Sequence, residues 1–248
     1  MGRASGRGDT HPIGIDGYGG IQMPEGIRLM VFDMAGTTVE DGGQVPLAFG
    51  AALGECGIGL TDEELADVRG ASKREAIAAL VARHAGPSWQ GRAGEVYASF
   101  VHHLEREFAA GVRPLPGAEA AFGFLRARGI KIALTTGFDR DIAGLLLDAL
   151  RWKTLTDTWF CGDDVPRGRP APYLIFRAME ATGVDSVHAV GAIGDTVLDL
   201  QAGYNAGLRL NVGTLSGAHG RDRMQREPHT HLIASVADLP RLIDTLRV

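Results

Sequence analysis

The pattern of apolar and polar residues divides the chain into two stretches with different predicted structure. An apolar run covers residues 29–32 and ends in Asp33, which predicts a short buried strand. Beyond it, apolar residues recur at three- and four-residue spacing, which is typical of amphipathic helices. The segments with this spacing are residues 45–58, 61–70, 72–86 and 88–111. None of them has the pattern of a strand.

From about Pro114 onward, short apolar runs alternate with helical patterns. The predicted helices are residues 117–129, 140–152, 172–183 and 196–207. The predicted strands are residues 130–136, 187–195 and 208–213, with a short strand near 158–162 and a final strand and helix within 231–246. Apolar strands that alternate with helices are typical of a parallel sheet covered on both faces. The fold class is therefore α/β, with a doubly wound, Rossmann-like core.

The helical stretch interrupts this α/β pattern and predicts an inserted domain. We expect a core formed by residues 27–41 and 112–248 and an all-helical cap formed by residues 42–111. Residues 1–26 are rich in Gly and Arg without periodicity, which predicts a mobile N-terminal tail. Because open parallel sheets bind ligands at the carboxyl ends of their strands, a cap inserted after the first strand could fold over the site.

Composition and charge narrow the functional classes. The chain has 248 residues, of which 45% are hydrophobic, so it can bury a sizeable core. Its formal net charge is -5, and no block of basic residues indicates a nucleic acid or a membrane surface as a partner. No apolar run is long enough to span a membrane, and the N-terminus has no apolar signal core, which predicts a cytoplasmic protein.

Polar residues that suit phosphate chemistry occur at successive predicted strand ends. They are Asp33, Thr136, Gly137, Asp195 and, four positions later, Asp199, while Arg169 lies in VPRGRPAPY just before a helix. Carboxylates without His or Cys suit a hard cation such as Mg2+, which leaves coordination positions for phosphoryl oxygens. The Thr hydroxyl, backbone amides and guanidinium suit the remaining oxygens. An uncoordinated Asp close to phosphorus can act as a nucleophile and form an acyl phosphate.

Taken singly, each of these residues has an ordinary structural explanation, such as a helix cap for a strand-terminal Asp. Their joint order, DxxGT, hhhTT, a basic residue before Pro, and GDxxxD, resembles the haloacid dehalogenase-like hydrolases over nearly all of residues 28–248. The segments FDMAGTTVE, TTGFDRD, GRPAPY and GDTVLDLQAGYNAG look like the phosphonoacetaldehyde hydrolase, or phosphonatase, branch. That branch has Ala in place of the second Asp of phosphatases and Arg in place of their Lys, as this chain has Ala35 and Arg169.

The resemblance implies a nucleophile and a metal site. Asp33 would be the nucleophile. Mg2+ would be held by Asp33, the carbonyl oxygen of Ala35 and Asp195, with Asp199 in support.

The resemblance also implies how the substrate is held. Thr136 and Arg169 would bind the phosphoryl group, together with Thr37 and Gly137 of the adjoining loops. The substrate would be a small phosphonate or phosphate, and relatives suggest a homodimer formed through the cap.

Ala35 bears on the kind of bond that is broken. In a phosphatase the second aspartate protonates the leaving alkoxide, and general acid–base help of this kind contributes roughly 10²–10⁴ in rate. A site without this acid suits a carbon leaving group whose electrons are taken up elsewhere. An iminium one bond away would take them up, and this needs a lysine amine that condenses with a carbonyl.

Lys73 is the candidate amine. It lies in RGASKREAI, where Ser72 and Glu75 have the spacing of a capping box, so Lys73 is expected to be the first residue of a helix. From the residues alone, a solvated surface lysine is the more ordinary explanation. The resemblance favours the catalytic role, because phosphonatases have their Schiff-base lysine three residues after a Gly at the start of a cap helix, as in Gly70 to Lys73.

The predicted substrate pocket departs from the phosphonatase pattern. Arg69 replaces a Met, Ala76 a His, Phe138 a Tyr and Gly43 a Cys. We interpret this as a related clade with a changed aldehyde or ketone substrate, in which Gly43 makes room and Arg69 meets an added hydroxyl or carboxylate.

Two other functions stay open on the sequence alone. One is a phosphate monoester phosphatase or phosphomutase on the same fold, against which Ala35 argues. The other is a non-catalytic phospho-metabolite-binding module, against which the intact nucleophile and metal acids argue.

Overall fold

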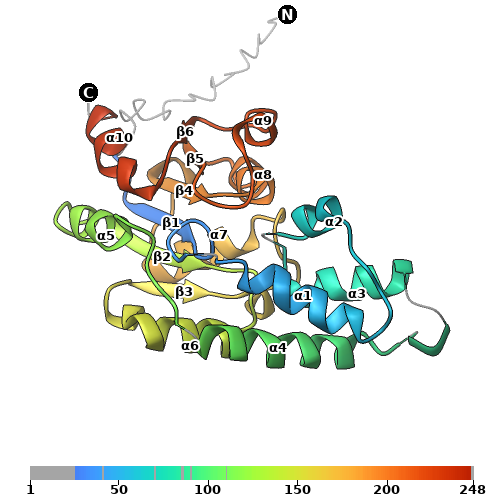
Figure 1. Cartoon of the computed structure of the whole chain (residues 1–248). Coiled ribbons are helices and arrows are strands. Elements are labelled where there is room, and N and C mark those ends of the chain that lie inside the picture. Colours follow the sequence, from blue (N-terminus) through green and yellow to red (C-terminus); the bar gives the residue numbers. More distant parts are fainter. Residues whose placement is uncertain are drawn as a thin grey trace, which may run out of the picture.

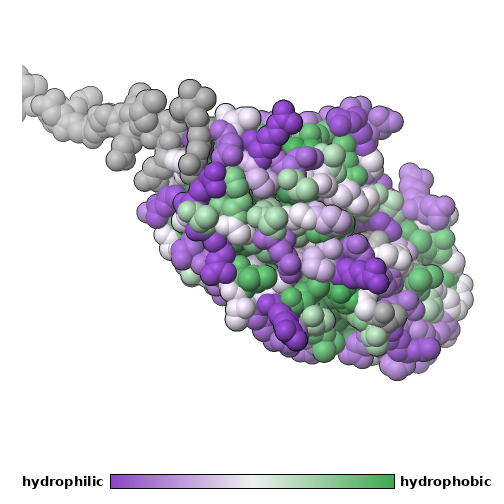
Figure 2. All heavy atoms as spheres, turned by 60° about the vertical axis from the view of Figure 1, so that its left-hand side comes forward, coloured by the Kyte–Doolittle hydropathy of each residue, from purple (hydrophilic) through white to green (hydrophobic). Residues whose placement is uncertain are grey.

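The computed structural model describes residues 26–40, 42–69, 71–84, 87–89, 91–109 and 111–246. The tail predicted for residues 1–26 lies outside this part of the chain, apart from Gly26. None of the helices in the described residues combines the length and the apolar character needed to cross a membrane. On the face shown in Figure 2, hydrophilic side chains are interspersed with apolar areas.

A parallel sheet of six strands, in the order β3-β2-β1-β4-β5-β6, forms the centre of the described structure. The strands are β1 (Leu29–Asp33), β2 (Lys131–Thr135), β3 (Thr158–Phe160), β4 (Val190–Gly194), β5 (Leu210–Thr214) and β6 (His231–Ile233). β1 lies in the middle, paired with β2 on one side and β4 on the other (Figure 1). The chain runs outward from β1 to β3 and then returns to β4, which confirms the doubly wound sheet.

Side chains of β1 alternate between the two faces of the sheet, as the pleat of a strand requires. Met30 and Phe32 belong to one hydrophobic cluster, and Leu29 and Val31 belong to a second. Because helices cover both faces, every residue of β1 is buried. This explains why its first four residues are all apolar rather than alternating with polar ones.

The covering helices form two layers. α5 (Ala118–Arg126), α6 (Arg140–Leu150) and α10 (Leu239–Thr245) contribute to the first cluster, and α7 (Tyr173–Thr182) and α8 (Val197–Asn205) contribute to the second. A short helix, α9 (Arg221–Met224), lies in the connection from β5 to β6. The sequence pattern did not predict α9.

A helical insertion follows β1. Its described helices are α1 (Gln44–Gly54), α2 (Asp62–Asp67), α3 (Lys73–His84) and α4 (Ala93–Ala109), and the described residues between β1 and α5 contain no strand, as predicted. α1 and α3 pack on α4, and the ring centroids of Phe49 and Phe100 lie 4.7 Å apart. The buried side chains of the insertion share one hydrophobic cluster with α5 and α6. In Figure 1, α1, α2 and α3 lie to the right of the sheet.

Two predicted details differ from the structure. The strand predicted for residues 187–195 begins only at Val190, because the three residues before it form a turn of 3-10 helix. The predicted capping box at α3 is only partly formed: the Glu75 amide donates to Oγ of Ser72 at 3.4 Å, but the Glu75 carboxylate accepts from the Gly168 amide of the core. Glu75 therefore connects the insertion to the core.

Candidate active site

The sheet topology brings two of the predicted acids to one edge. Asp33 is the last residue of β1, and Asp195 follows directly after β4, the neighbouring strand. Thr135 ends β2 on the other side of β1, in register with Asp33. The strand order reverses between β1 and β4, so the loops that follow them diverge and leave a crevice at the carboxyl ends.

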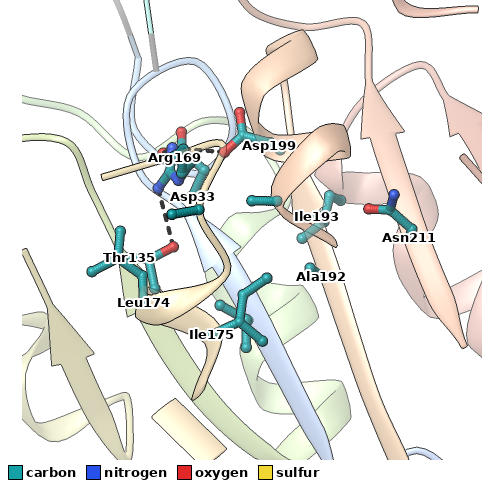
Figure 3. Close-up of a pocket in the computed structure, with 13 residues that line it drawn as sticks. Asp33, Thr135, Arg169, Leu174, Ile175, Ala192, Ile193, Asp199 and Asn211 are labelled. Atoms are coloured by element: carbon teal, nitrogen blue, oxygen red, sulfur yellow. Dashed lines mark hydrogen bonds and ion pairs between the residues drawn. The ribbon is translucent and has the colours of Figure 1, made fainter. Parts of the chain in front are cut away.

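Arg169 lies between two acids. Its Nη1 atom is 2.7 Å from Oδ1 of Asp33 and 2.6 Å from Oδ1 of Asp199. Its Nη2 atom donates a hydrogen bond to the Thr135 hydroxyl at 3.1 Å. Figure 3 shows Arg169 next to Asp33, with Asp199 to the right and apolar residues of α7 and β4 below. All four polar side chains are buried, so these contacts are shielded from water.

Asp195 is held by the loops after β1 and β5. The Thr37 hydroxyl donates to its Oδ1 atom at 3.0 Å, and the Ala218 amide donates to its Oδ2 atom at 2.7 Å. Gly36 and Gly217 approach the carboxylate so closely that a Cβ atom on either would collide with it. Gly36 also has a φ of 87°, a conformation that favours glycine. Both loops therefore depend on small residues to close around Asp195.

Asp199 has two roles at the start of α8. Its Oδ2 atom accepts hydrogen bonds from the amide and the hydroxyl of Thr196, which completes a capping box. Its Oδ1 atom is the partner of Arg169. Asp199 therefore both caps α8 and belongs to the charged site.

The three acids place negative charge in a buried space. Burial raises the pKa of Asp33 to about 6, against the opposing effect of Arg169, and the charge of Asp199 raises it further. Burial also raises the pKa of Asp195, with Asp33 and Asp199 adding to the shift. Although burial disfavours its charge, Asp199 and Asp33 raise the pKa of Arg169, which stays a cation.

This set of groups fits a hard divalent cation. One carboxylate oxygen from each of Asp33, Asp195 and Asp199 lies within 4.8 Å of the others. One guanidinium does not neutralise three ionised carboxylates, and the raised pKa values of Asp33 and Asp195 follow from that excess charge and from burial. Oxygen ligands without His or Cys are the donors that Mg2+ prefers.

A cleft beside the acids brings the insertion to the core. The residues that line it from the core are Asp33, Ala35, Thr136, Gly137, Phe138, Asp195, Thr196 and Ala218. Those from the insertion are Val45, Arg69 and Lys73. Among these described lining residues, Asp33 and Asp195 are the only acids. Position 35 contributes a methyl group where a second acid would lie.

Lys73 is the first residue of α3 and is only 5% exposed. Its amide donates to the carbonyl oxygen of Gly137 at 3.0 Å, which ties the start of α3 to the loop after β2. Its Nζ atom donates to the Ala71 carbonyl oxygen at 3.0 Å and lies 5.6 Å from the centroid of the Phe138 ring. Gly70, whose spacing to Lys73 supports the resemblance, lies outside the described residues.

The four residues predicted for the substrate pocket have different surroundings. Arg69 and Phe138 line the cleft. Ala76 is buried in the larger hydrophobic cluster, and Gly43 precedes α1 with a φ of 88°. Neither Ala76 nor Gly43 is among the residues that line the cleft.

Polar contacts next to the cleft connect the insertion to the core. Arg74 of α3 pairs with Asp139 of the core at 2.7 Å, beside the contact between Glu75 and Gly168. On the other side of the cleft, the imidazole of His219 reaches the insertion at α2. The segment that contains Lys73 is therefore tied to the core from two sides.

Some contacts of this site were not predicted from the sequence. Thr135, not Thr136, bonds to Arg169, whereas the Thr136 hydroxyl accepts from the Phe138 amide at 3.2 Å. The Thr-Thr pair signals a hydroxyl at this strand end but does not say which one faces the guanidinium. Ala218 and His219 belong to the long connection after β5, where no local pattern indicates a contact with the acids.

Comparison with known proteins identifies relatives of the chain. The sequence profile of the haloacid dehalogenase-like hydrolases matches residues 27–207. A phosphonoacetaldehyde hydrolase from Bacillus cereus is 31% identical over 204 residues, which cover 77% of each chain. Another from Hahella chejuensis is 28% identical over 254 residues, which cover 88% of this chain and 86% of its own.

A solved structure shares the fold. A phosphonoacetaldehyde hydrolase-like protein from Oleispira antarctica superposes with a TM-score of 0.80, covering 92% of this chain and 95% of its own. The sequence identity is 22%, so this likeness concerns the fold alone.

The buried acids predict that the metal-free protein loses stability as the pH rises. Folded Asp33 keeps its proton up to about pH 6, whereas an unfolded Asp loses it near 3.8. Between these values the folded state binds more protons, so the free energy of unfolding falls by roughly 3 kcal/mol as the pH rises. Roughly 2 kcal/mol of this decrease falls between pH 4.5 and pH 7. For a chain of this size, thermal unfolding in EDTA should therefore occur roughly 4–8 °C lower at pH 7 than at pH 4.5.

Asp33→Asn serves as the control for this experiment. It removes one titrating acid from the cluster, so its unfolding temperature in EDTA should decrease less between pH 4.5 and 7. Circular dichroism monitors the thermal unfolding. An equally steep decrease of the unfolding temperature in the variant would contradict the assignment of this effect to Asp33.

Proposed function

This chain belongs to the haloacid dehalogenase-like hydrolases, and we propose that within this family it hydrolyses the carbon–phosphorus bond of a 2-oxoalkylphosphonate, such as phosphonoacetaldehyde or its 1-hydroxy derivative. The observation that carries the proposal is the shared cleft of Asp33 and Lys73, in which Ala35 takes the place of an acid. The phosphonoacetaldehyde hydrolases among the relatives support it.

In the first step Lys73 prepares the substrate carbonyl. The neutral amine attacks the carbonyl carbon, and the carbinolamine takes up a proton from solvent as its oxygen leaves as water, which gives an iminium between Nζ and that carbon. Lys73 is buried, and its amide is fixed to Gly137, so the amine meets the substrate beside the core loop rather than on a free surface. The nearby Phe138 ring limits water around Nζ.

In the second step Asp33 takes the phosphoryl group. A carboxylate oxygen attacks phosphorus, the carbon–phosphorus electron pair moves into the adjoining carbon–carbon bond, and the iminium becomes a neutral enamine. Protonation of the enamine carbon and addition of water at the imine carbon release the carbonyl product and Lys73. A second water cleaves the acyl phosphate, which releases phosphate and restores Asp33.

The remaining polar groups of the site bind the phosphoryl oxygens. Arg169 already contacts the nucleophile, so a phosphoryl group on Asp33 comes within reach of its N–H donors. Thr136 and Gly137 line the cleft and offer a hydroxyl and an amide to the same group. Mg2+ bound by Asp33, Asp195 and the Ala35 carbonyl oxygen, with Asp199 in support, would offset the negative charge of the phosphonate.

The absence of an acid at position 35 agrees with this electron flow. An alkoxide leaving group needs a proton as it departs, and general acid help contributes roughly 10²–10⁴ in rate. An enamine carbon departs as a neutral species and needs no such proton in the same step. Among the described residues of the cleft, both acids belong to the predicted metal cluster, which disfavours phosphate monoesters as substrates.

The Schiff base can be trapped. Phosphonoacetaldehyde with borohydride should inactivate the enzyme and leave a reduced adduct on Lys73, located by peptide mass mapping. Lys73→Arg keeps the charge but cannot condense, so adduct and phosphate release should both be lost. Asp33→Asn should still form the adduct but release no phosphate. A Lys73→Arg enzyme that cleaves the phosphonate would rule out the proposal in favour of phosphatase-like chemistry.

Activity should depend on a hard divalent cation. Excess EDTA should abolish phosphate release, and Mg2+ should restore it. Asp195→Asn should raise the Mg2+ concentration for half-maximal activation at least about tenfold, because it weakens the oxygen donor set. Thermal stabilisation by Mg2+ at pH 7, measured without substrate, gives the same affinity independently of turnover. Full activity in EDTA would refute the metal site.

Arg69 should select among phosphonates. Its guanidinium lines the cleft with Lys73, and a hydrogen bond from a charged donor contributes roughly 1.5–3 kcal/mol. Arg69→Met should therefore reduce kcat/KM for 1-hydroxy-2-oxoethylphosphonate, relative to phosphonoacetaldehyde, by roughly tenfold or more. Arg83→Met removes an exposed charge from the same insertion and is the control. An unchanged ratio in Arg69→Met would exclude this contact.

A further inference from the structure

His219 is a buried polar residue that the proposed chemistry does not use. It is 2% exposed. The Val197 amide donates to its Nδ1 atom at 3.0 Å, so this nitrogen carries no proton, and Nε2–H donates to the Ala66 carbonyl oxygen at 2.9 Å. Burial lowers the pKa of His219, which agrees with the neutral ring that these two contacts require. The two ring nitrogens thus bind two different parts of the molecule.

On the core side, His219 belongs to a loop that surrounds the acids. Its own amide donates to the Asp195 carbonyl oxygen at 3.2 Å, and the amide before it, of Ala218, donates to the Asp195 carboxylate. Ser216 of the same loop donates to the Gly36 carbonyl oxygen at 3.0 Å, next to the nucleophile loop. Val197, bound through Nδ1, is the first residue of α8. Any shift of this loop therefore moves the groups that hold Asp195.

On the insertion side, His219 holds the start of the segment that contains Lys73. Ala66 lies in the last turn of α2, and the chain runs from there through Arg69 to Lys73. The Lys73 amide is bonded to Gly137. The segment is therefore attached to the core near both ends, through His219 at Ala66 and through Gly137 at Lys73. The neighbouring ion pair of Arg223 with Asp67 is exposed, so it adds little to this attachment.

We propose that His219 is a positioning residue that holds the loop around Asp195 through Nδ1 and the segment that contains Lys73 through Nε2. This proposal rests on the proposed function for its catalytic meaning. The Nδ1 contact keeps the loop and the start of α8 in the arrangement that presents Asp195. The Nε2 contact keeps Ala66 against the core, so that the amine stays over the nucleophile. One rigid ring thus sets the distance between the metal acids and the imine-forming side of the cleft.

Two substitutions separate the two contacts. The Asn side chain places an acceptor near the position of Nδ1 but does not reach Ala66, whereas the Gln side chain places a donor near the position of Nε2. His219→Asn should leave the Mg2+ affinity, read from thermal stabilisation, within about twofold. It should speed hydrogen–deuterium exchange of the Lys73 amide about tenfold and slow adduct formation on Lys73 to a similar extent.

His219→Gln should show the opposite pattern. Mg2+ affinity should fall about tenfold, while exchange of the Lys73 amide stays within about threefold of wild type. The same substitutions at His188, an exposed histidine before β4 and away from the cleft, are the controls and should change neither quantity. Circular dichroism and the melting temperature of each variant show that it is folded before the comparison.

The outcome distinguishes two separate positioning contacts from a purely structural role. If both His219 variants change Mg2+ affinity and Lys73 exchange together, or if neither changes either quantity, His219 is only a core residue and the proposal is overturned. A wild-type protein that forms no adduct would instead overturn the proposed function. The affinity and exchange measurements need no substrate, so they still decide whether His219 positions each of the two sides.

Discussion

The structure depends on one electrostatic constraint, which is the burial of three carboxylates around a single guanidinium at the carboxyl edge of the sheet. Removing ionised groups from water is unfavourable unless they are paired and hydrogen-bonded. The chain satisfies this requirement with donors from four separate segments: Arg169, the Thr37 hydroxyl, the Ala218 amide and the Thr196 amide. Burial raises the pKa of Asp33, and the charge of Asp199 adds to this shift. A bound cation would offset the remaining excess negative charge.

The same electrostatic constraint explains why the loops after β1 and β5 have glycine next to the acids. Gly36 and Gly217 lie against the Asp195 carboxylate, where any side chain would collide with it. Two loops that are far apart in sequence can therefore bring backbone donors to one carboxylate. The Asp195 loop in turn contacts His219, and through it the helical insertion. The charged groups at the sheet edge and the placement of the insertion are thus parts of one hydrogen-bonded network.

The sequence predicted those features that depend on neighbouring residues along the chain, such as the strands of the sheet. The apolar run before Asp33 and the alternation after Pro114 predicted the sheet, because a strand covered on both faces must be apolar throughout. The contact between Thr37 and Asp195 spans 158 positions and has no such signal. The choice of Thr135 over Thr136 depends on the twist and register of β2. The partner of Glu75 changed because Gly168 of the core competes with the local capping contact.

In the proposed reaction, the movement of the carbon–phosphorus electron pair explains why the acids belong to the core and the amine belongs to the insertion. An acid at position 35 would be useful to a leaving oxygen, but it would add a fourth carboxylate to a cluster that already holds excess negative charge. In the proposed reaction an amine on the insertion avoids this, because it would place a positive iminium on the far side of the scissile bond from Asp33. That arrangement works only if the insertion is held at a fixed distance from the acids. The buried contacts of Lys73 with Gly137 and of Ala66 with His219 meet this requirement on the two sides of the cleft.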